Sequence, residues 1–331
     1  MEIIEPKIEI MKYIITLIIG MSFINCADKK NDQKAISEKK DVFKIAYNVL
    51  SDTAIDNYDV FVMDMDGGNS KNITQFDGVE WTYNAAGSDL YVISDKDTTH
   101  RIYFLYRTDA EGSAYEKVTN FRLADSWIGS RYDGNELIVR PHRTVDTAFY
   151  IIDKKGKILN KLKPDLAYIS DPHFSPDGSQ IVFRGADKPF KKDIGYVDEL
   201  YLMNADGSDL KQLTHYPAND TTAKWYNYHA GPPRWHPTEN FISYNSKQGG
   251  KSSLFAIAPD GSGKRELFPQ DSLYQGWHEW SPDGKWLAIE VFDSEGKQYH
   301  LQLVNWETKE TQILTGTEYR FQQAPVFVKV D

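Results

Sequence analysis

Short apolar runs alternate with turn-forming segments along almost the whole chain. Ile181–Phe183 and Trp286–Ile289, for example, each follow a Ser-Pro-Asp-Gly segment and are followed in turn by another acidic or glycine-rich turn. The 3.6-residue period of amphipathic helices is scarce between these runs. Short strands separated by Gly, Asp, Pro and Asn are typical of an all-β protein.

Two kinds of turn recur in a fixed order and define a repeat. The first kind is Ser175–Gly178 and Ser281–Gly284, with weaker copies at 84–87, 131–134 and 236–239. Its proline presets φ at the second turn position, and its glycine accepts the left-handed conformation. The second kind recurs at Asp66-Gly67, Glu111-Gly112, Lys155-Gly156, Asp206-Gly207, Asp260-Gly261 and Glu307-Thr308.

The spacing of these turns predicts a ring of blades. Repeats of about 40–50 residues that each hold four short strands are typical of β-propellers. Five repeats carry all four strands, whereas the first contains only Val42–Val49, Tyr58–Met63 and Asn72–Gln75. Pro325–Val328 can supply the missing inner strand. We therefore predict a six-bladed β-propeller of four-stranded antiparallel blades over residues 42–331, closed by pairing of the N- and C-terminal strands, which removes exposed sheet edges.

The repeats resemble those of TolB-type propellers, which are WD40-like. The resemblance rests on the Ser-Pro-Asp-Gly turns, the run Asn204–Thr214 and the six-fold count. It implies a fold, because such repeats are poor guides to function. TolB proteins also have an N-terminal α/β domain, for which residues 27–41 leave no room. A Tol–Pal role in envelope constriction is therefore not expected.

The N-terminal region has the features of an export signal. Lys12 precedes an apolar run, Tyr13–Ile24, that is shorter than the roughly 20 residues of a membrane span. We therefore interpret residues 1–26 as a signal peptide that starts at Met1 or Met11. Its end, Phe23-Ile24-Asn25-Cys26, resembles a bacterial lipobox, which implies lipid attachment at Cys26. The alternative is an ordinary signal peptide with an incidental cysteine.

Residues 27–41 are polar, with Ile36 as the one large apolar side chain, and predict a solvated tether. The formal charge of −10 and the pI near 5.3 argue against a nucleic-acid partner. We expect a monomer in the bacterial cell envelope, bound to a membrane through the N-terminal lipid. Ala27 favours the outer membrane, and either a periplasmic or a surface-facing orientation is compatible with the sequence.

Strand direction predicts the binding face. In a four-stranded antiparallel blade, the two tight turns share one face, and the other connections share the opposite face. The long insertions Gly185–Glu199 and Pro217–Pro233 both belong to the second group. Function concentrates in loops on a rigid scaffold, so we expect the binding surface there.

The insertions are rich in aromatic and cationic residues that suit a glycan or a peptide. The candidate binding residues are Trp225, Tyr226, Tyr228, Arg234, Phe190 and Tyr196. The alternative is that these aromatic side chains only pack the loops onto the rim of the propeller.

A second hypothesis concerns a metal ion. The candidate ligands, near the inner strands, are His173, His229, His278, Gln322 and Gln323. Imidazole groups that converge on a propeller axis can bind a divalent metal ion. The set loosely resembles the His/Gln cluster with which oligogalacturonate lyases, also propellers, hold such an ion. In that case Arg234 would neutralise a substrate carboxylate.

Serine hydrolase, phosphate-loop and His-Glu-x-x-His motifs are absent from the sequence. We therefore expect a binding or scaffold module, without a cofactor, for a glycan, a peptide or an envelope protein. The alternative is a metal-dependent polysaccharide lyase.

Overall fold

The computed structural model describes residues 42–217, 220 and 222–330. In this part of the chain, every regular element is a β-strand, in agreement with the all-β prediction. No helix of the described part is long and apolar enough to cross a membrane. The predicted signal peptide with Cys26 and the predicted tether lie outside the described residues.

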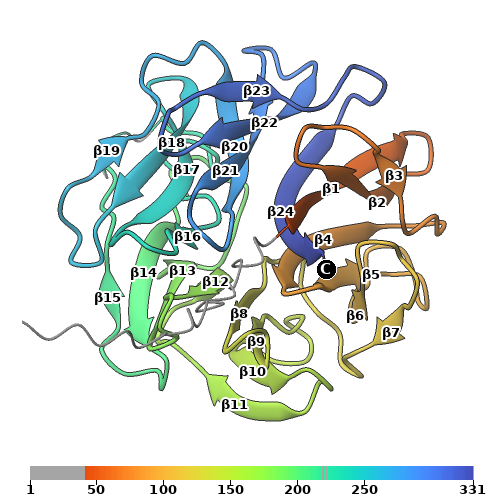
Figure 1. Cartoon of the computed structure of the whole chain (residues 1–331). Helices are drawn as coiled ribbons and strands as arrows, with labels where there is room; N and C mark the ends of the chain where they lie inside the picture. Colours follow the sequence, from red (N-terminus) through yellow and green to blue (C-terminus); the bar gives the residue numbers. More distant parts are fainter. Residues whose placement is uncertain (1–41, 218–219, 221, 331) are drawn as a thin grey trace, which may run out of the picture. The chain divides into compact units, whose positions relative to one another are not determined.

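The strands form six four-stranded antiparallel sheets that are arranged in a ring around a central axis (Figure 1). This arrangement confirms the predicted six-bladed propeller. The strands of blade 1, from the axis outward, are β24 (Gln322–Val330), β1 (Val42–Asp52), β2 (Asn57–Asp64) and β3 (Lys71–Asn72). Blade 2 has β4 (Glu80–Ala86), β5 (Asp89–Ser94), β6 (Phe104–Thr108) and β7 (Glu116–Lys117). Blade 3 has β8 (Gly129–Arg131), β9 (Glu136–Val139), β10 (Phe149–Asp153) and β11 (Ile158–Leu162).

The second half of the ring has the same strand order. Blade 4 has β12 (Tyr168–Phe174), β13 (Gln180–Ala186), β14 (Glu199–Asn204) and β15 (Lys211–Gln212). Blade 5 has β16 (Arg234–Trp235), β17 (Ile242–Gln248), β18 (Lys251–Ile257) and β19 (Arg265–Glu266). Blade 6 has β20 (Tyr274–Trp280), β21 (Trp286–Phe292), β22 (Tyr299–Asn305) and β23 (Thr311–Ile313).

Blade 1 is built from both ends of the described chain, as the repeat count predicts. β24 lies beside β1 (Figure 1), and their antiparallel register runs from Val42 opposite Val330 to Val49 opposite Gln322. Ala324, Val326 and Val328 on β24 are buried in the hydrophobic core. The C-terminal strand therefore closes the ring with both hydrogen bonds and apolar packing.

The hydrophobic core is divided among the spaces between neighbouring blades. One cluster joins blades 3 and 4 through Phe149 and Phe183, whose ring centroids lie 5.3 Å apart. Others join blades 4 and 5, 5 and 6, and 6 and 1, while a larger cluster continues through blades 1 to 3. Because the middle strands bury both faces, they appear in the sequence as unbroken apolar runs.

The outermost strands are short, and side-chain hydrogen bonds supplement their pairing. In four blades a threonine beyond the strand accepts the backbone N–H of a residue in the neighbouring strand at 2.9–3.0 Å; these threonines are Thr74, Thr119, Thr214 and Thr315. All four hydroxyls are buried. Each therefore satisfies a buried donor that would be costly to leave unpaired.

Candidate functional site

The two faces of the ring differ as the strand directions predict. One hollow, of about 430 Å³, is lined by first-kind turn residues such as Gly87, Pro176 and Pro282. We call it the turn-side hollow. On the opposite face, the second insertion contributes Trp225 and His229 to another hollow at the axis. The tight turns and the insertions therefore lie on opposite faces.

The hollow on the insertion side, here called the axial mouth, collects residues from all six blades. Its volume is about 460 Å³. Its walls are Tyr58, Trp81, Tyr83, Arg101, Asp125, Ser126, Trp127, Asp171, Arg184, Trp225, His229, Gly231, Pro232, Asn245, Trp277 and Gln323. Convergence of so many blades on a rigid ring makes this hollow the candidate binding site.

Bulges in four inner strands direct side chains into the axial mouth. In β24, β4, β12 and β20, the inner strand has one more residue than its partner strand over a short segment, so the pairing register shifts there. The bulged segments hold, or adjoin, Gln323, Tyr83, Asp171 and Trp277, which all line the mouth. Asp171 has a positive φ of 53°. Bulges that redirect a side chain are common beside functional sites.

Aromatic rings form one continuous wall of the mouth. Tyr58 lies 4.5 Å from Trp81, measured between ring centroids, and Tyr83 lies 4.7 Å from Trp127. Trp277 makes edge contacts at about 6 Å with both Trp81 and Trp127. The rings fix one another in position, so the wall can contact a ligand at a low cost in conformational entropy.

A charged network forms another part of the wall. The Arg184 guanidinium has its Nε 2.6 Å from Asp171 Oδ2 and its Nη1 3.5 Å from Asp198 Oδ2. Nδ1 of His229 lies 2.5 Å from Asp198 Oδ1, and its Nε2 contacts Arg184. Although burial opposes ionisation, His229 and Arg184 lower the pKa of the Asp198 carboxyl. The network therefore holds fixed charges and ties the second insertion to blade 4.

The aromatic residues of the two insertions contact each other. Phe190 of the first insertion makes edge contacts with Tyr196 at 5.3 Å and with Trp225 of the second insertion at 5.9 Å. Tyr226 is exposed, and its ring centroid lies 5.6 Å from that of Trp225. Tyr228 packs at 5.7 Å on Tyr216. These rings join the loops to each other and to blade 4, and Trp225 also reaches the mouth.

Arg234 lies inside the propeller and is fully buried. Its guanidinium lies 4.0 Å from the ring centroid of Trp127, and its Nε donates to Glu279 at 2.7 Å. Because Trp127 lines the axial mouth and Glu279 lines the turn-side hollow, Arg234 lies between the two hollows. It is placed to support the floor of the mouth from below.

The residues predicted to bind metal are distributed over different environments. His229 and Gln323 line the axial mouth, whereas His173 lines the turn-side hollow. Nε2 of His278 lies 2.7 Å from Ser243 Oγ, and the Gln322 amide donates to backbone carbonyls such as that of Gly316. Among the described residues, no group of three His, Cys, Asp or Glu side chains is placed to hold a metal ion.

The imidazoles of His173 and His278 have unusually low basicity. Burial, together with the positive charge of Arg234, lowers the pKa of His173 to about 3 and the pKa of His278 well below its ordinary value. Both rings are therefore neutral at physiological pH. Both rings form hydrogen bonds within the protein; the backbone N–H of Trp235, for example, donates to Nδ1 of His173 at 3.4 Å.

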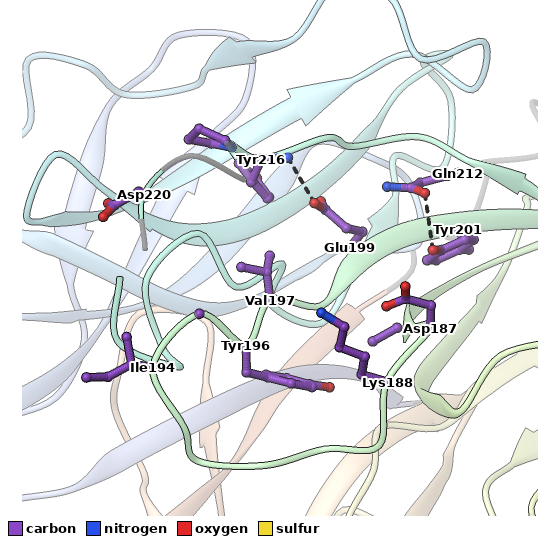
Figure 2. Close-up of a pocket in the computed structure, with 13 residues that line it drawn as sticks. Asp187, Lys188, Ile194, Tyr196, Val197, Glu199, Tyr201, Gln212, Tyr216 and Asp220 are labelled. Atoms are coloured by element: carbon purple, nitrogen blue, oxygen red, sulfur yellow. Dashed lines mark hydrogen bonds between the residues drawn. The ribbon is translucent and has the colours of Figure 1, made fainter. Parts of the chain in front are cut away.

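A further pocket of about 540 Å³ lies at the outer edge of blade 4, beneath the first insertion (Figure 2). Glu199 and Tyr201 face it from β14 (Figure 2). Glu199 Oε1 accepts the backbone N–H of Tyr216 at 2.9 Å, and the Tyr201 hydroxyl donates to Gln212 at 3.2 Å. The polar groups of Glu199 and Tyr201 are therefore already hydrogen-bonded within the protein. The axial mouth, to which every blade contributes, therefore remains the stronger candidate although it is smaller.

Trp225, His229 and Gln323, which the sequence predicts as site residues, line the mouth, whereas most of the aromatic wall was not predicted. Trp81, Tyr83, Trp127 and Trp277 stand on three different blades and have no common local motif. A glycine in an inner strand was the signal that could have predicted a bulge and a redirected side chain; Gly276, directly before Trp277, is an example. Glycine inside a strand often marks a bulge.

These features define the class of the protein as a six-bladed β-propeller with an axial binding mouth. No family model matches the chain. It is 29% identical over 106 residues to the Tol-Pal system protein TolB of Anaeromyxobacter dehalogenans. That match covers 31% of this chain and 21% of the relative, so the chain matches only about a fifth of the relative's length.

Solved structures extend the likeness to most of the chain. TolB from Acinetobacter baumannii has a TM-score of 0.64 at 15% identity, covering 86% of this chain and 66% of the other. A putative TolB from Agrobacterium tumefaciens has a TM-score of 0.57 at 16% identity, covering 83% of this chain and 89% of the other. The chain therefore has a TolB-like propeller fold.

An oligogalacturonate lyase in complex with manganese shares the fold at a TM-score of 0.50 and 12% identity, covering 82% of this chain and 72% of the other. At that identity the likeness concerns the fold alone. Manganese belongs to that complex, whereas the described residues of the present chain contain no group of three His, Cys, Asp or Glu side chains that could hold a metal ion. The metal site remains a prediction from the sequence.

Proposed function

We propose that this protein is a binding module of the bacterial cell envelope, and that its axial mouth binds a peptide segment of an envelope protein. The observation that carries the proposal is the axial mouth itself. It combines a rigid aromatic wall and fixed charges in a hollow of about 460 Å³. Large aromatic residues in a concave, preformed site are the usual anchors for a binding partner.

The mixture of charges favours a peptide over a uniformly charged ligand. Arg101 and Arg184 present positive charge, whereas Asp125 and Asp171 present negative charge. A peptide offers backbone donors, backbone acceptors and varied side chains to such a surface. The mouth needs little rearrangement to bind, because its arginine and carboxylate groups already hold one another in place.

The chemistry of the mouth supports binding more than catalysis. His229 has both ring nitrogens engaged, one with Asp198 and the other with Arg184. Both nitrogens thus face side chains of the network and not a ligand in the mouth. A general base needs a nitrogen within reach of the proton that it removes.

The predicted signal peptide and the lipobox-like Cys26 support an envelope location, with the lipid as the membrane anchor. The likeness to Tol-Pal system protein TolB agrees with that location. On this proposal, the tether of residues 27–41 holds the propeller beside an outer membrane, where it meets segments of neighbouring envelope proteins.

Peptide selection on the purified full-length protein tests the proposal. We expect selected peptides to bind at least about tenfold more weakly to Tyr58→Ala and Trp225→Ala, because both rings line the mouth. Fluorescence polarisation with labelled peptides gives the dissociation constants, and circular dichroism checks the fold of each variant.

The matched control is Tyr132→Ala, which removes an exposed ring on the turn side. It should leave peptide affinity within about twofold of the parent protein. Equal binding by all three variants, or selective binding of glycans without peptides, would refute the proposed role of the mouth.

A further inference from the structure

A second hollow, of about 320 Å³, opens beside the axial mouth and is rich in arginine. Its walls include Arg101, Tyr103, Asp125, Arg140, His142 and Arg143. Arg101 and Asp125 also line the axial mouth, so the two hollows are neighbours that share part of their walls. We call this second hollow the arginine groove.

Positive charge in the groove is only partly compensated. Arg101 is paired with Asp56 at 2.8 Å. Arg140 donates to the neutral hydroxyl of Ser170 at 3.2 Å, and its guanidinium lies 4.9 Å from the Tyr168 ring centroid. Its positive charge, like that of Arg101, favours the ionised form of Asp125 in the same groove. The Arg143 side chain is exposed and has no hydrogen bond or ion pair with any described residue. Neither Arg140 nor Arg143 therefore has a direct ion pair among the described residues, although the net charge of the chain is −10.

The pKa of His142 shows that the groove is electrostatically positive. Its partial burial and the nearby charges of Arg143, Arg122 and Arg140 lower the pKa of its imidazole. Three arginines therefore act on the same small region. Asp125 is the carboxylate that lines the groove, and its Oδ1 already accepts the Tyr83 hydroxyl at 2.8 Å.

We propose that the arginine groove binds an acidic segment of the peptide partner, next to the part of that partner that occupies the axial mouth. This inference rests on the proposed function of the mouth. The guanidinium group is planar and presents paired donors that match the two oxygens of a carboxylate. Arg140 and Arg143 can each receive one acidic side chain, while Arg101 stays paired with Asp56.

The geometry favours an acidic peptide over an anionic glycan. A polyuronate carries a carboxylate on every sugar, so a chain that entered the mouth from the groove would meet Asp125 and Asp171. Repulsion between these carboxylates and those of the glycan would oppose binding. A peptide can place acidic residues over the arginines and neutral residues over the carboxylates.

Titration with a labelled peptide of two glutamates followed by four alternating glycine and serine residues tests the groove in the purified full-length protein, because its neutral part can lie over Asp125. We expect Arg140→Gln/Arg143→Gln to weaken binding at least about tenfold. The control Lys188→Gln/Lys191→Gln makes the same change in net charge among exposed residues of the first insertion. It should change affinity less than about twofold. Binding should also raise the pKa of His142, which proton NMR can follow.

Equal loss of affinity in both double variants would overturn the proposal, because the attraction would then be non-specific. Tighter binding of trigalacturonate than of the diglutamate peptide would also overturn it and would indicate a glycan site. The experiment distinguishes failure of the groove from failure of the mouth. Tyr58→Ala should retain binding of the diglutamate peptide, whereas the arginine double variant should lose it.

Discussion

Glu80 has an unusual environment for a carboxyl group. It is fully buried at the start of β4, where Oε1 accepts the Ser94 hydroxyl at 2.8 Å and Oε2 has no hydrogen-bond partner among the described residues. Burial raises the pKa of Glu80 to about 8. Glu290 is similar, since burial raises the pKa of its carboxyl to about 8 as well. Both groups are therefore protonated in the folded protein at neutral pH.

These carboxyls make stability depend on pH. In the unfolded chain they ionise near their ordinary pKa of 4.5, so between pH 4.5 and about 8 the folded state binds more protons. The free energy of unfolding must then fall as pH rises through this range. We expect Glu80→Gln, which keeps the shape without the charge, to be more stable than the parent protein at pH 8 by roughly 2–4 kcal/mol.

Urea unfolding at pH 5 and at pH 8 measures this effect. At pH 5 the advantage of Glu80→Gln should nearly disappear. Glu136→Gln is the control, because Glu136 is ion-paired with Arg131 and only partly exposed. It should show no such gain at pH 8. An identical pH dependence in Glu80→Gln and the parent protein would contradict the buried neutral carboxyl.

At the scale of the elements, the second-kind turns do more than reverse the chain. Each glycine has a positive φ, and several also lie against the outer strand of the preceding blade. A Cβ added at Gly112 of blade 2 would lie 2.5 Å from the carbonyl oxygen of Ile73 in blade 1. Gly67 has the same relation to Leu314, at 2.5 Å. Glycine at these turns therefore lets neighbouring blades pack closely.

A pair of alanine substitutions separates backbone conformation from blade packing. Gly112 and Gly87 have similar φ values of 69° and 61°, but a Cβ at Gly87 would meet nothing within 4 Å. We expect Gly87→Ala to cost about 1 kcal/mol, the usual penalty for the left-handed conformation. Gly112→Ala should cost roughly 3 kcal/mol, because overpacking is added. Thermal unfolding measures both, and equal losses would show that the blade contact contributes nothing.

At the scale of the whole molecule, the decisive feature is closure of the ring. β24 contributes the buried side chains of Ala324, Val326, Phe327 and Val328 to two core clusters. It also supplies Gln323 to the axial mouth. Loss of this strand would expose the edge of β1 and several apolar side chains, each worth about 1.5–3 kcal/mol on burial.

We therefore expect a protein that lacks residues 322–331 to be unfolded or to melt at least about 10 °C lower. The summed loss is comparable to the 5–15 kcal/mol that stabilises a typical protein. Differential scanning calorimetry makes the comparison, and deletion of the predicted tether, residues 27–41, is the control that should leave the melting temperature unchanged. A truncated protein that melts with the parent would mean that β24 is dispensable for the ring.

The sequence by itself determined the number of blades, the closure through β24 and the face on which the insertions lie. These features follow from local chemistry, because turn residues fix the reversals and apolar runs fix the strands. Only the tertiary structure decided what meets at the axis. Trp81, Trp127 and Trp277 come from different blades, and bulges set the direction of several side chains there. The tertiary structure also placed Arg234 in the interior, and it placed His173 and His229 in different hollows. The sequence could not give these positions, because a contact between distant strands depends on the pairing register of every blade between them.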